Sequence, residues 1–223
     1  MPKNNSILEV TNLNAAYGQS KVIFDINLEV KPNERVAIVG RNGAGKTTML
    51  KCIAGLLKAS SGSVIYDGME IIGKAPFEVA KMGLKYIDQD KEVFLDLTVR
   101  ENLQLSSYAT GDHDWDRVFE HFPKLKILLD RKGAYLSGGE RQMLMIGRAI
   151  LGDPKVLLID EPTEGLAPSI VNDLVATFHD LSKDSAIVIV GQNLSFVSRV
   201  AQRIYAVKEG RMITEIRDEE EIK

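Results

Sequence analysis

A glycine-rich segment, residues 40–47, constrains this 223-residue chain more than any other feature. It reads Gly-Arg-Asn-Gly-Ala-Gly-Lys-Thr and matches the pattern G-x-x-x-x-G-K-[ST] at every fixed position. The apolar run 36–39 before it predicts a strand, and residues 47–57 after it predict a helix. Glycines let consecutive backbone N–H groups turn inward, and a helix N-terminus favours anions. The segment therefore predicts a phosphate-binding loop and a site for a nucleoside triphosphate.

The side chains of this loop have predicted roles. Lys46 places a positive charge near the β- and γ-phosphates, and Thr47 offers a hydroxyl to Mg²⁺. Glycine-rich turns between strand and helix also occur without a ligand, but the complete match in this context favours the phosphate site. The predicted nucleotide-binding positions are Gly40, Arg41, Asn42, Gly43, Ala44, Gly45, Lys46 and Thr47.

Two adjacent carboxylates follow a second apolar run. Residues 156–159 are typical of a strand buried on both faces, and the chain continues as Asp160-Glu161-Pro162. A carboxylate at the carboxyl end of a central strand can hold the water shell of Mg²⁺, so Asp160 is a predicted metal-site residue. Glu161 lies one residue further and is the predicted general base that polarises an attacking water. A solvated strand end is the alternative, and the apolar residues before the pair argue against it.

A second anion-binding device is predicted about ninety residues after the first. Ser137, Gly138 and Gly139 begin a predicted helix and offer a hydroxyl, unobstructed N–H groups and a helix dipole. Such helix starts are common, so the triplet alone is a weak signal. In a chain with one phosphate loop, however, a second receptor in a separate part of the fold has nothing to bind unless another subunit supplies the nucleotide.

The remaining pattern predicts an α/β protein. Apolar and alternating runs predict strands at 7–13, 22–30, 63–66, 84–87 and 186–190, helix 168–181, and a terminal hairpin of 205–208 and 212–216. Residues 97–151 are predicted to be mostly helical. Alternating buried strands and helices imply a parallel α/β core, with the helical block as a candidate subdomain.

Composition narrows the class of protein. Apolar residues make up 44% and charged residues 26%, as in ordinary globular proteins, and the net charge of −3 gives no footprint for nucleic acid. No apolar run is long enough to span a bilayer and the first residues lack the apolar core of a signal peptide, so a cytoplasmic location is expected. The single cysteine, Cys52, is predicted to be a buried packing residue.

The motifs together resemble the ATP-binding subunits of ATP-binding-cassette (ABC) transporters over essentially the whole chain. The resemblance is carried by residues 40–47, Gln89, residues 136–142 with Leu-Ser-Gly-Gly-Glu, and residues 157–162. It implies a P-loop NTPase core with a parallel central sheet, an N-terminal antiparallel β subdomain and an inserted helical subdomain. It further implies one ABC ATPase domain over residues 1–223, with 1–88 and 155–223 as the core and 89–154 as the helical signature subdomain.

The resemblance also implies cofactors and partners. ATP and Mg²⁺ are the expected cofactors, held in a head-to-tail homodimer or heterodimer in which residues 40–48, Thr48 included, face Ser137, Gly138 and Gly139 of the other subunit. Tyr17 is expected to stack on the adenine ring, and Gln89 to contact Mg²⁺ and the attacking water. Residues 90–105 are expected to contact an integral membrane permease, which an extracytoplasmic solute-binding protein serves indirectly. No nucleic-acid partner is expected.

Two positions depart from the usual family pattern. Gln192 stands where the family usually has a histidine that contacts the γ-phosphate, and an amide can hydrogen-bond there but cannot carry a proton. Ala167 replaces the aspartate that usually follows the Asp-Glu-Pro motif. Both departures resemble the ATPases of branched-chain amino-acid and urea-type importers, although Gly191 differs from the glutamate of that subgroup. Catalytic roles are thus expected for Lys46, Gln89, Glu161 and Gln192.

The expected function is an ATPase on the inner face of the cell membrane that energises an importer of branched-chain or related amino acids. Urea or short amides are the alternative solutes. A soluble ABC ATPase acting on ribosomes or DNA is a second hypothesis, and it fits less well because such proteins usually carry two cassettes or long insertions. A third is a binding module that uses ATP only as a dimerisation switch.

Overall fold

Two β-sheets organise the structure, a computed structural model that describes residues 5–89 and 93–217. The antiparallel sheet has the order β2-β1-β4-β5, and the six-stranded sheet has the order β10-β9-β3-β8-β7-β6. The antiparallel sheet comprises β1 (Leu8–Tyr17), β2 (Ser20–Val30), β4 (Ser61–Tyr66) and β5 (Met69–Glu70). The six-stranded sheet comprises β3 (Arg35–Val39), β6 (Leu84–Ile87), β7 (Val156–Asp160), β8 (Ala186–Gly191), β9 (Arg203–Lys208) and β10 (Arg211–Ile216).

The six-stranded sheet is parallel except at one edge. Strands β9, β3, β8, β7 and β6 run parallel, and β10 pairs antiparallel with β9. The expected α/β architecture, with a parallel central sheet and an antiparallel N-terminal sheet, is confirmed. Because four neighbouring strands are parallel, the loops after β3, β8, β7 and β6 all leave from the same edge of the sheet.

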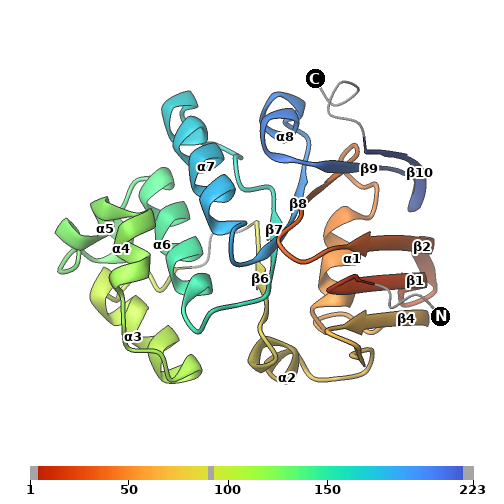
Figure 1. The fold of residues 1–223 in the computed structure, drawn as a ribbon, viewed down its shortest axis with the longest axis horizontal. Coiled ribbons are helices and arrows are strands. Elements are labelled where there is room, and N and C mark those ends of the chain that lie inside the picture. The colour runs from red at the N-terminus through yellow and green to blue at the C-terminus, as the bar shows by residue number, and fades with distance from the viewer. Residues whose placement is uncertain (1–4, 90–92, 218–223) are drawn as a thin grey trace.

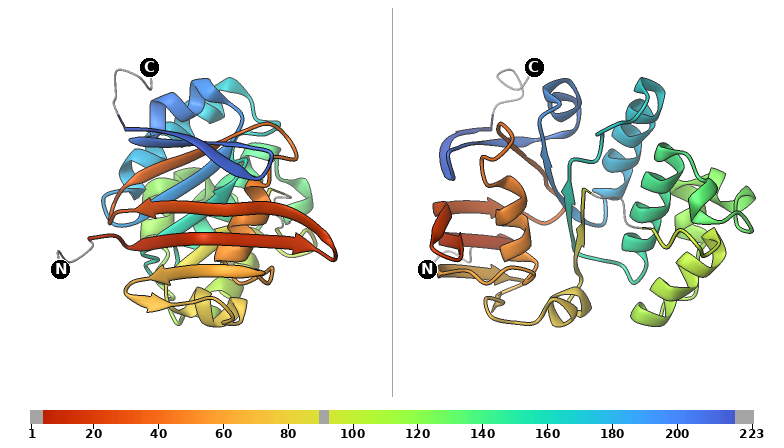
Figure 2. Two further views of the ribbon diagram at one scale, coloured as in Figure 1. Left: turned by 90° about the vertical axis from the view of Figure 1, so that its right-hand side faces the viewer. Right: turned by 180° about the vertical axis from the view of Figure 1, so that it is seen from behind.

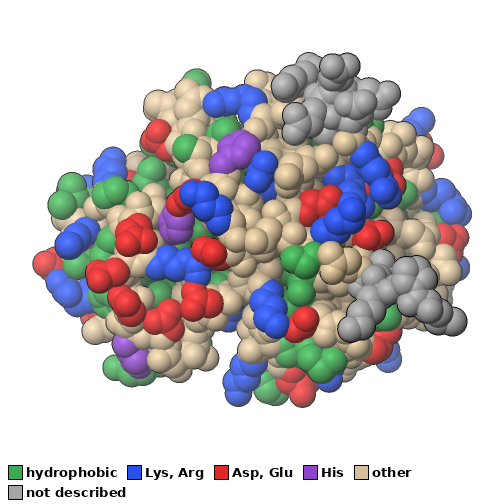
Figure 3. All heavy atoms as spheres, viewed as in Figure 1, with side chains coloured by type: hydrophobic (Ala, Val, Ile, Leu, Met, Phe, Trp, Pro, Cys, Tyr) green, Lys and Arg blue, Asp and Glu red, His purple; other side chains and the backbone are tan. Residues whose placement is uncertain are grey.

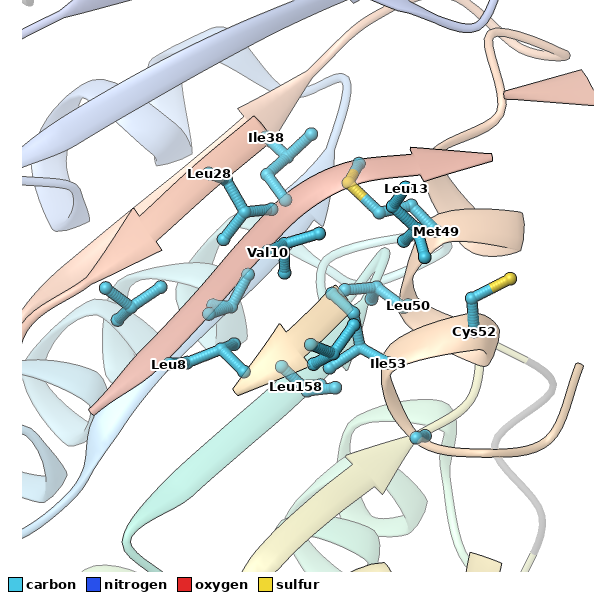
Figure 4. Packing of buried hydrophobic residues seen from close by; sticks show 14 of the residues in the cluster. Leu8, Val10, Leu13, Leu28, Ile38, Met49, Leu50, Cys52, Ile53 and Leu158 are labelled. Carbon is cyan, nitrogen blue, oxygen red and sulfur yellow. The ribbon is translucent and has the colours of Figure 1, made fainter. Parts of the chain in front are cut away.

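Side chains on the central strands alternate between two cores. Leu157 and Ile159 pack on one face with α3 (Val99–Thr110), α6 (Gly138–Ile150) and α7 (Pro168–Leu181), whereas Val156 and Leu158 pack on the other face with the antiparallel sheet. All four are fully buried, as the continuous apolar run predicts for a parallel strand covered on both sides. Figure 4 shows the second core, where Leu158 and Ile38 of the central sheet approach Leu8 and Val10 of β1.

Helix α1 (Lys46–Ile53) lies between the two sheets, as the view from behind in Figure 2 shows. Its Met49, Leu50 and Ile53 are buried in the core between the sheets (Figure 4). The helix ends earlier than the predicted residue 57. Gly55 follows the cap with a φ of 75°, and the N–H of Leu56 returns to the carbonyl of Lys51, which closes the helix with a glycine C-cap.

A block of helices lies beside the sheets, at the left of Figure 1. It contains α3 (Val99–Thr110), α4 (Asp116–His121), α5 (Pro123–Ile127), the 3₁₀ turn η1 (Gly133–Tyr135) and α6 (Gly138–Ile150). Helices α3 and α6 each begin with a capping box, Thr98 with Glu101 and Ser137 with Glu140. A Cβ on Gly147 would lie 2.9 Å from Val118 Cγ1, so a residue without a side chain allows α6 and α4 to pack closely.

The remaining helices flank the central sheet. Helices α7 (Pro168–Leu181) and α8 (Leu194–Val200) cover the end near β8 and β9, and α2 (Pro76–Lys81) precedes β6 (Figure 1). Helices α2 and α8 and strand β5 were not predicted. The two helices have six and seven residues, less than two full turns, and β5 has two residues, so none of them shows a helical or alternating pattern. Within the described residues, none of the helices combines the length and apolar character needed to cross a bilayer.

Candidate nucleotide-binding site

The predicted site residues converge at the carboxyl edge of the central sheet. The glycine-rich loop follows β3, Gln89 follows β6, Glu161 follows β7 and Gln192 follows β8. The strand order β3-β8-β7-β6 places these four loops side by side, which the sequence alone could not order. A ligand at this edge meets groups from four separate parts of the chain, the usual location of sites in open α/β sheets.

A polar cleft of about 370 Å³ lies over the glycine-rich loop. Its lining is Val22, Asn42, Gly43, Ala44, Gly45, Lys46, Thr47, Thr48, Gln89 and Glu161. Gly45 has a φ of 95° and caps α1, and a Cβ there would lie 2.6 Å from Ile23 Cγ2. The loop therefore needs glycine at this position both for its backbone conformation and for its contact with β2.

The ammonium group of Lys46 lies within the loop. Its Nζ donates hydrogen bonds to the carbonyls of Gly40 (2.9 Å) and Arg41 (3.3 Å) and lies 3.6 Å from Glu161 Oε1. The Lys46 side chain is 6% exposed. A buried positive charge inside a glycine-rich loop at a helix N-terminus is an arrangement that binds phosphate oxygens.

Asp160 is a buried carboxylate next to Thr47. Burial raises the pKa of its carboxyl, the hydrogen bond with the Thr47 side chain opposes this, and the nearby Glu161 and Asp88 add to the increase. Its Oδ2 accepts a long hydrogen bond (3.4 Å) from the Tyr86 hydroxyl, whereas its Oδ1 is buried without a hydrogen-bond partner in the described structure. A buried carboxylate oxygen without a partner is costly for a protein unless a cation compensates it.

Gln192, which follows β8, hydrogen-bonds the carboxylate of Glu161, which follows the neighbouring strand β7. The backbone N–H and Nε2 of Gln192 lie 3.3 Å from the two Glu161 carboxylate oxygens, and Nε2 also donates to Asn42 Oδ1 (2.6 Å). Glu161 has a φ of 44°, a strained conformation for a residue with a side chain, and its N–H bonds the carbonyl of Val190. The Gln192 amide thus connects the predicted base to the glycine-rich loop.

Gln89 enters the cleft from the end of β6. Its backbone N–H bonds Asp88 Oδ1 (2.8 Å), and Asp88 forms an ion pair with Lys51 of α1 (3.3 Å). Its side-chain Nε2 donates to Glu164 Oε2 over 2.6 Å. The end of β6 is therefore tied both to the helix after the phosphate loop and to the turn after β7.

Six of the predicted nucleotide contacts do not line this cleft: Tyr17, Gly40, Arg41, Ser137, Gly138 and Gly139. Gly40 and Arg41 still belong to the loop, and their carbonyls accept hydrogen bonds from Lys46. Tyr17 is 52% exposed and ends β1 opposite Ser20, close to Val22 of the cleft wall. Ser137 and Gly138 are exposed at the start of α6, and Gly139 is buried against Ile170 of α7. The Ser137 hydroxyl accepts a hydrogen bond from the N–H of Glu140 in its own helix. The structure thus brings the loop, Gln89, Asp160, Glu161 and Gln192 together and leaves the serine–glycine triplet on another surface.

Three residues near the site were not given roles from the sequence: Tyr86, Asp88 and Glu164. Tyr86 contacts Asp160, and Asp88 and Glu164 hold Gln89. The position of Tyr86 and Asp88 at the end of a predicted strand was an available signal. The contact of Glu164 was not, because it depends on how the turn after β7 folds towards β6.

Comparison with known proteins identifies the family. The family model described as "ABC transporter" matches residues 23–164. The high-affinity branched-chain amino acid transport ATP-binding protein BraG of Pseudomonas aeruginosa is 36% identical over 93% of this chain and 91% of its own length. The probable branched-chain amino acid transport ATP-binding protein LivF of Archaeoglobus fulgidus is 36% identical over 92% of this chain and 90% of its own length.

A solved structure agrees with these relatives. The ADP conformation of an ATP-binding cassette of an ABC transporter superposes with a TM-score of 0.87 at 29% identity, over 97% of this chain and 93% of that one. ATP-binding subunits of this family bind and hydrolyse ATP, dimerise and work with membrane permease components. The chain belongs to the ABC transporter family, as one of its ATP-hydrolysing subunits.

Proposed function

We propose that this ATPase energises a membrane importer for branched-chain or related amino acids. The similarity to BraG and LivF extends over nine-tenths of the chain and supports this solute class. The Gln192-Asn193 and Glu164-Gly165-Leu166-Ala167-Pro168 segments support it as well, since they resemble the importer subgroup. In this proposal the protein is peripheral on the inner face of the membrane, and a solute-binding protein delivers the solute to the permease.

The residues present fit Mg²⁺ bound together with ATP. The main supporting observation is the Asp160 carboxylate. Its Oδ1 is buried without a hydrogen-bond partner in the described structure, and the carboxyl also interacts with the Thr47 side chain. The described residues contain no cluster of three His, Cys, Asp or Glu side chains suited to a metal. Mg²⁺ is commonly held by one or two carboxylates together with substrate phosphates and waters, so such a cluster is not needed. Thr47, Asp160 and Gln89 would hold the ion, which neutralises developing charge on the phosphates.

Each remaining group has a proposed role in hydrolysis. Lys46 binds β- and γ-phosphate oxygens, and the N–H groups of the glycine-rich loop surround the phosphate chain. Glu161 accepts a proton from the attacking water, and Gln192 orients the Glu161 carboxylate and donates to the γ-phosphate. Tyr17 provides an aromatic face for adenine at the cleft wall.

The serine–glycine triplet supports a site shared between two subunits. Ser137 and Gly138 are exposed on a face that does not line the chain's own cleft. In a head-to-tail pair, this helix N-terminus supplies a hydroxyl and N–H groups to the γ-phosphate bound by the other copy. ATP contacts both surfaces only when the pair is closed, so its binding energy favours closure and hydrolysis reverses it.

A groove of about 310 Å³ between β6, α3 and α6 is the proposed permease site. Lys85, Asp88, Ala109 and Arg148 are among its lining residues. Burial lowers the pKa of both Lys85 and Arg148, which favours a partner carrying a carboxylate. The molecular surface is indented between α3 and α2 at the lower edge of Figure 3. We propose that a permease helix with an acidic side chain binds here.

Exposed apolar side chains surround this groove. Phe94, Leu95, Leu105 and Tyr108 are between 41% and 75% exposed, and the Arg148 guanidinium lies 5.0 Å from the centre of the Phe94 ring. They fall within or next to the predicted contact segment 90–105, of which residues 90–92 lie outside the described structure. The proposed helical subdomain, residues 89–154, thus presents a mixed apolar and basic surface to the membrane partner.

Turnover and native partners test this function. Glu161→Gln keeps the size of the side chain but removes the base, so ATP turnover should fall by about 10²- to 10⁴-fold, while the exposed Glu120→Gln changes little.

Purification of the chain from native membranes should retain a permease, and reconstituted vesicles should take up leucine, isoleucine or valine when ATP is supplied. Uptake of urea or acetamide instead would change the solute class. Recovery with ribosomes or DNA, or full turnover by Glu161→Gln, would reject the proposal.

A further inference from the structure

We propose that Glu164 is a positioning residue that orients the Gln89 amide so that its oxygen faces the Mg²⁺ site. The inference builds on the proposed role of Gln89 as a metal contact. It rests on one short hydrogen bond, in which Gln89 Nε2 donates to Glu164 Oε2 over 2.6 Å. Gln89 follows β6 and Glu164 lies in the turn after β7, 75 positions further along the sequence.

The chemistry of the pair determines which end of the amide faces Glu164. A glutamine amide has an NH₂ group that donates and an oxygen that accepts, whereas a carboxylate only accepts. The NH₂ end of Gln89 therefore faces Glu164, and Oε1 is the end left to the cleft that Gln89 lines. Mg²⁺ selects oxygen ligands, so this is the orientation that a metal contact requires.

The backbone on both sides fixes the pair in place. The N–H of Gln89 is bound by Asp88, and Asp88 is paired with Lys51 of α1. The N–H of Glu164 bonds the carbonyl of Glu161, which forms a turn directly after the catalytic strand. Glu164 is exposed while Gln89 is half-buried, so the carboxylate approaches the amide from the solvent side. Partners that orient metal ligands typically change metal affinity by about 10- to 100-fold.

The test measures nucleotide affinity rather than turnover. All variants carry Glu161→Gln, so that bound ATP persists, and affinity for a fluorescent ATP analogue is measured against Mg²⁺ concentration. Mg²⁺ should increase nucleotide affinity in every variant. For Glu164→Ala, the Mg²⁺ concentration that gives half of this increase should be about tenfold higher. Glu164→Gln keeps an acceptor oxygen and should have a smaller effect. Asp173→Ala, which removes an exposed carboxylate from α7, is the matched control and should have none.

A double-mutant cycle distinguishes a positioning role from a general structural one. In a Gln89→Ala background, Glu164→Ala should cause no further change, because the group that it orients is absent. A further loss in that background would overturn the inference. The inference would also be overturned if Glu164→Ala left the Mg²⁺ dependence of nucleotide affinity unchanged while Gln89→Ala weakened it. In that case the proposed role of Gln89 would stand. If Gln89→Ala itself binds Mg²⁺ normally, both the role of Gln89 and the inference fail. Thermal unfolding confirms that each variant is folded.

Discussion

At the scale of single residues, a small group of buried charges determines the properties of the site. Lys46, Asp160 and Glu161 lie together, and Asp160 keeps one buried oxygen without a hydrogen-bond partner in the described structure. Such an arrangement costs folding free energy and is retained where a ligand compensates it. The motif residues themselves could be predicted from the sequence, because their spacing is diagnostic. The contacts of Tyr86 and Glu164 were not predicted. Tyr86 lies in a predicted strand, but its contact with Asp160 depends on the pairing of β6 with β7, and the contact of Glu164 depends on how the turn after β7 folds.

Asp160→Asn should stabilise the protein in the absence of nucleotide and Mg²⁺ at pH 7. The pKa of the Asp160 carboxyl is raised in the folded state, so the folded chain binds this proton more tightly than the unfolded chain. The contribution of Asp160 to stability is therefore most favourable below the unfolded pKa and declines as pH rises through the folded one. Replacing the carboxylate removes that penalty, and each kcal/mol gained raises the melting temperature by about 2–4 °C.

Thermal melts at pH 7 check this prediction. The same variant should lose the stabilisation that wild type gains from adding ATP with Mg²⁺. A lower melting temperature for Asp160→Asn without ligands would show that the charged form is well compensated by Thr47 and Lys46, contrary to the account.

At the scale of elements, most strands and the long helices followed from sequence patterns, whereas the short helices α2 and α8 and the two-residue strand β5 did not. The run 156–159 predicted β7 because a strand buried on both faces is continuously apolar. Helix α1 stopped before its predicted end because Gly55 adopts a left-handed conformation that the apolar pattern does not report. Helix α6 began where the Ser137-Gly138-Gly139 signal placed it. The Ser137 hydroxyl accepts the capping hydrogen bond from the Glu140 N–H, and its own O–H is still able to donate to a ligand.

The two capping boxes allow these roles of Ser137 to be separated. Thr98→Ala and Ser137→Ala each remove a side-chain cap and should lower unfolding free energy by about 0.5–2 kcal/mol. Ser137→Asp should keep the cap, because aspartate is a good N-cap residue, yet place a negative charge where the γ-phosphate binds. ATP-dependent dimerisation should therefore fail in Ser137→Asp and persist in Thr98→Ala. Denaturant titrations and light scattering with ATP report the two properties. Dimerisation of Ser137→Asp at the wild-type ATP concentration would count against a phosphate-binding role.

At the scale of the whole molecule, the groove and the nucleotide site share one strand. Asp88 and Gln89 directly follow strand β6, and Asp88 lines the groove while Gln89 lines the cleft. A shift of the helical block against the sheet would therefore reach both sites at once. The sequence predicted the nucleotide site and a permease contact at residues 90–105. It did not predict the groove, because none of the groove's lining residues falls in that segment and they come together only in the fold.

Filling the groove should uncouple the ATPase from its permease. Ala109→Trp adds a large ring to the groove on α3, and Ala176→Trp adds the same ring to an exposed position on α7. Overpacking costs about 1–3 kcal/mol, so permease affinity should fall by about 5- to 150-fold for Ala109→Trp and stay unchanged for Ala176→Trp. Both isolated variants should bind ATP normally. Equal permease recovery with both variants in detergent pull-downs would place the docking surface elsewhere.

The central claim, that two copies hold each ATP jointly, can be tested by mixing two inactive variants. Lys46→Ala disables the phosphate loop and Ser137→Asp disables the helix tip, so each alone should be inactive. In a mixed pair, one site contains both defects and the other contains none. Turnover of an equal mixture should therefore recover to about a quarter of the wild-type value if pairs form at random, and to about a half if only mixed pairs form, because each mixed pair has one intact site. A mixture that stays as inactive as its components, at every ratio and concentration that supports wild-type activity, would contradict the account.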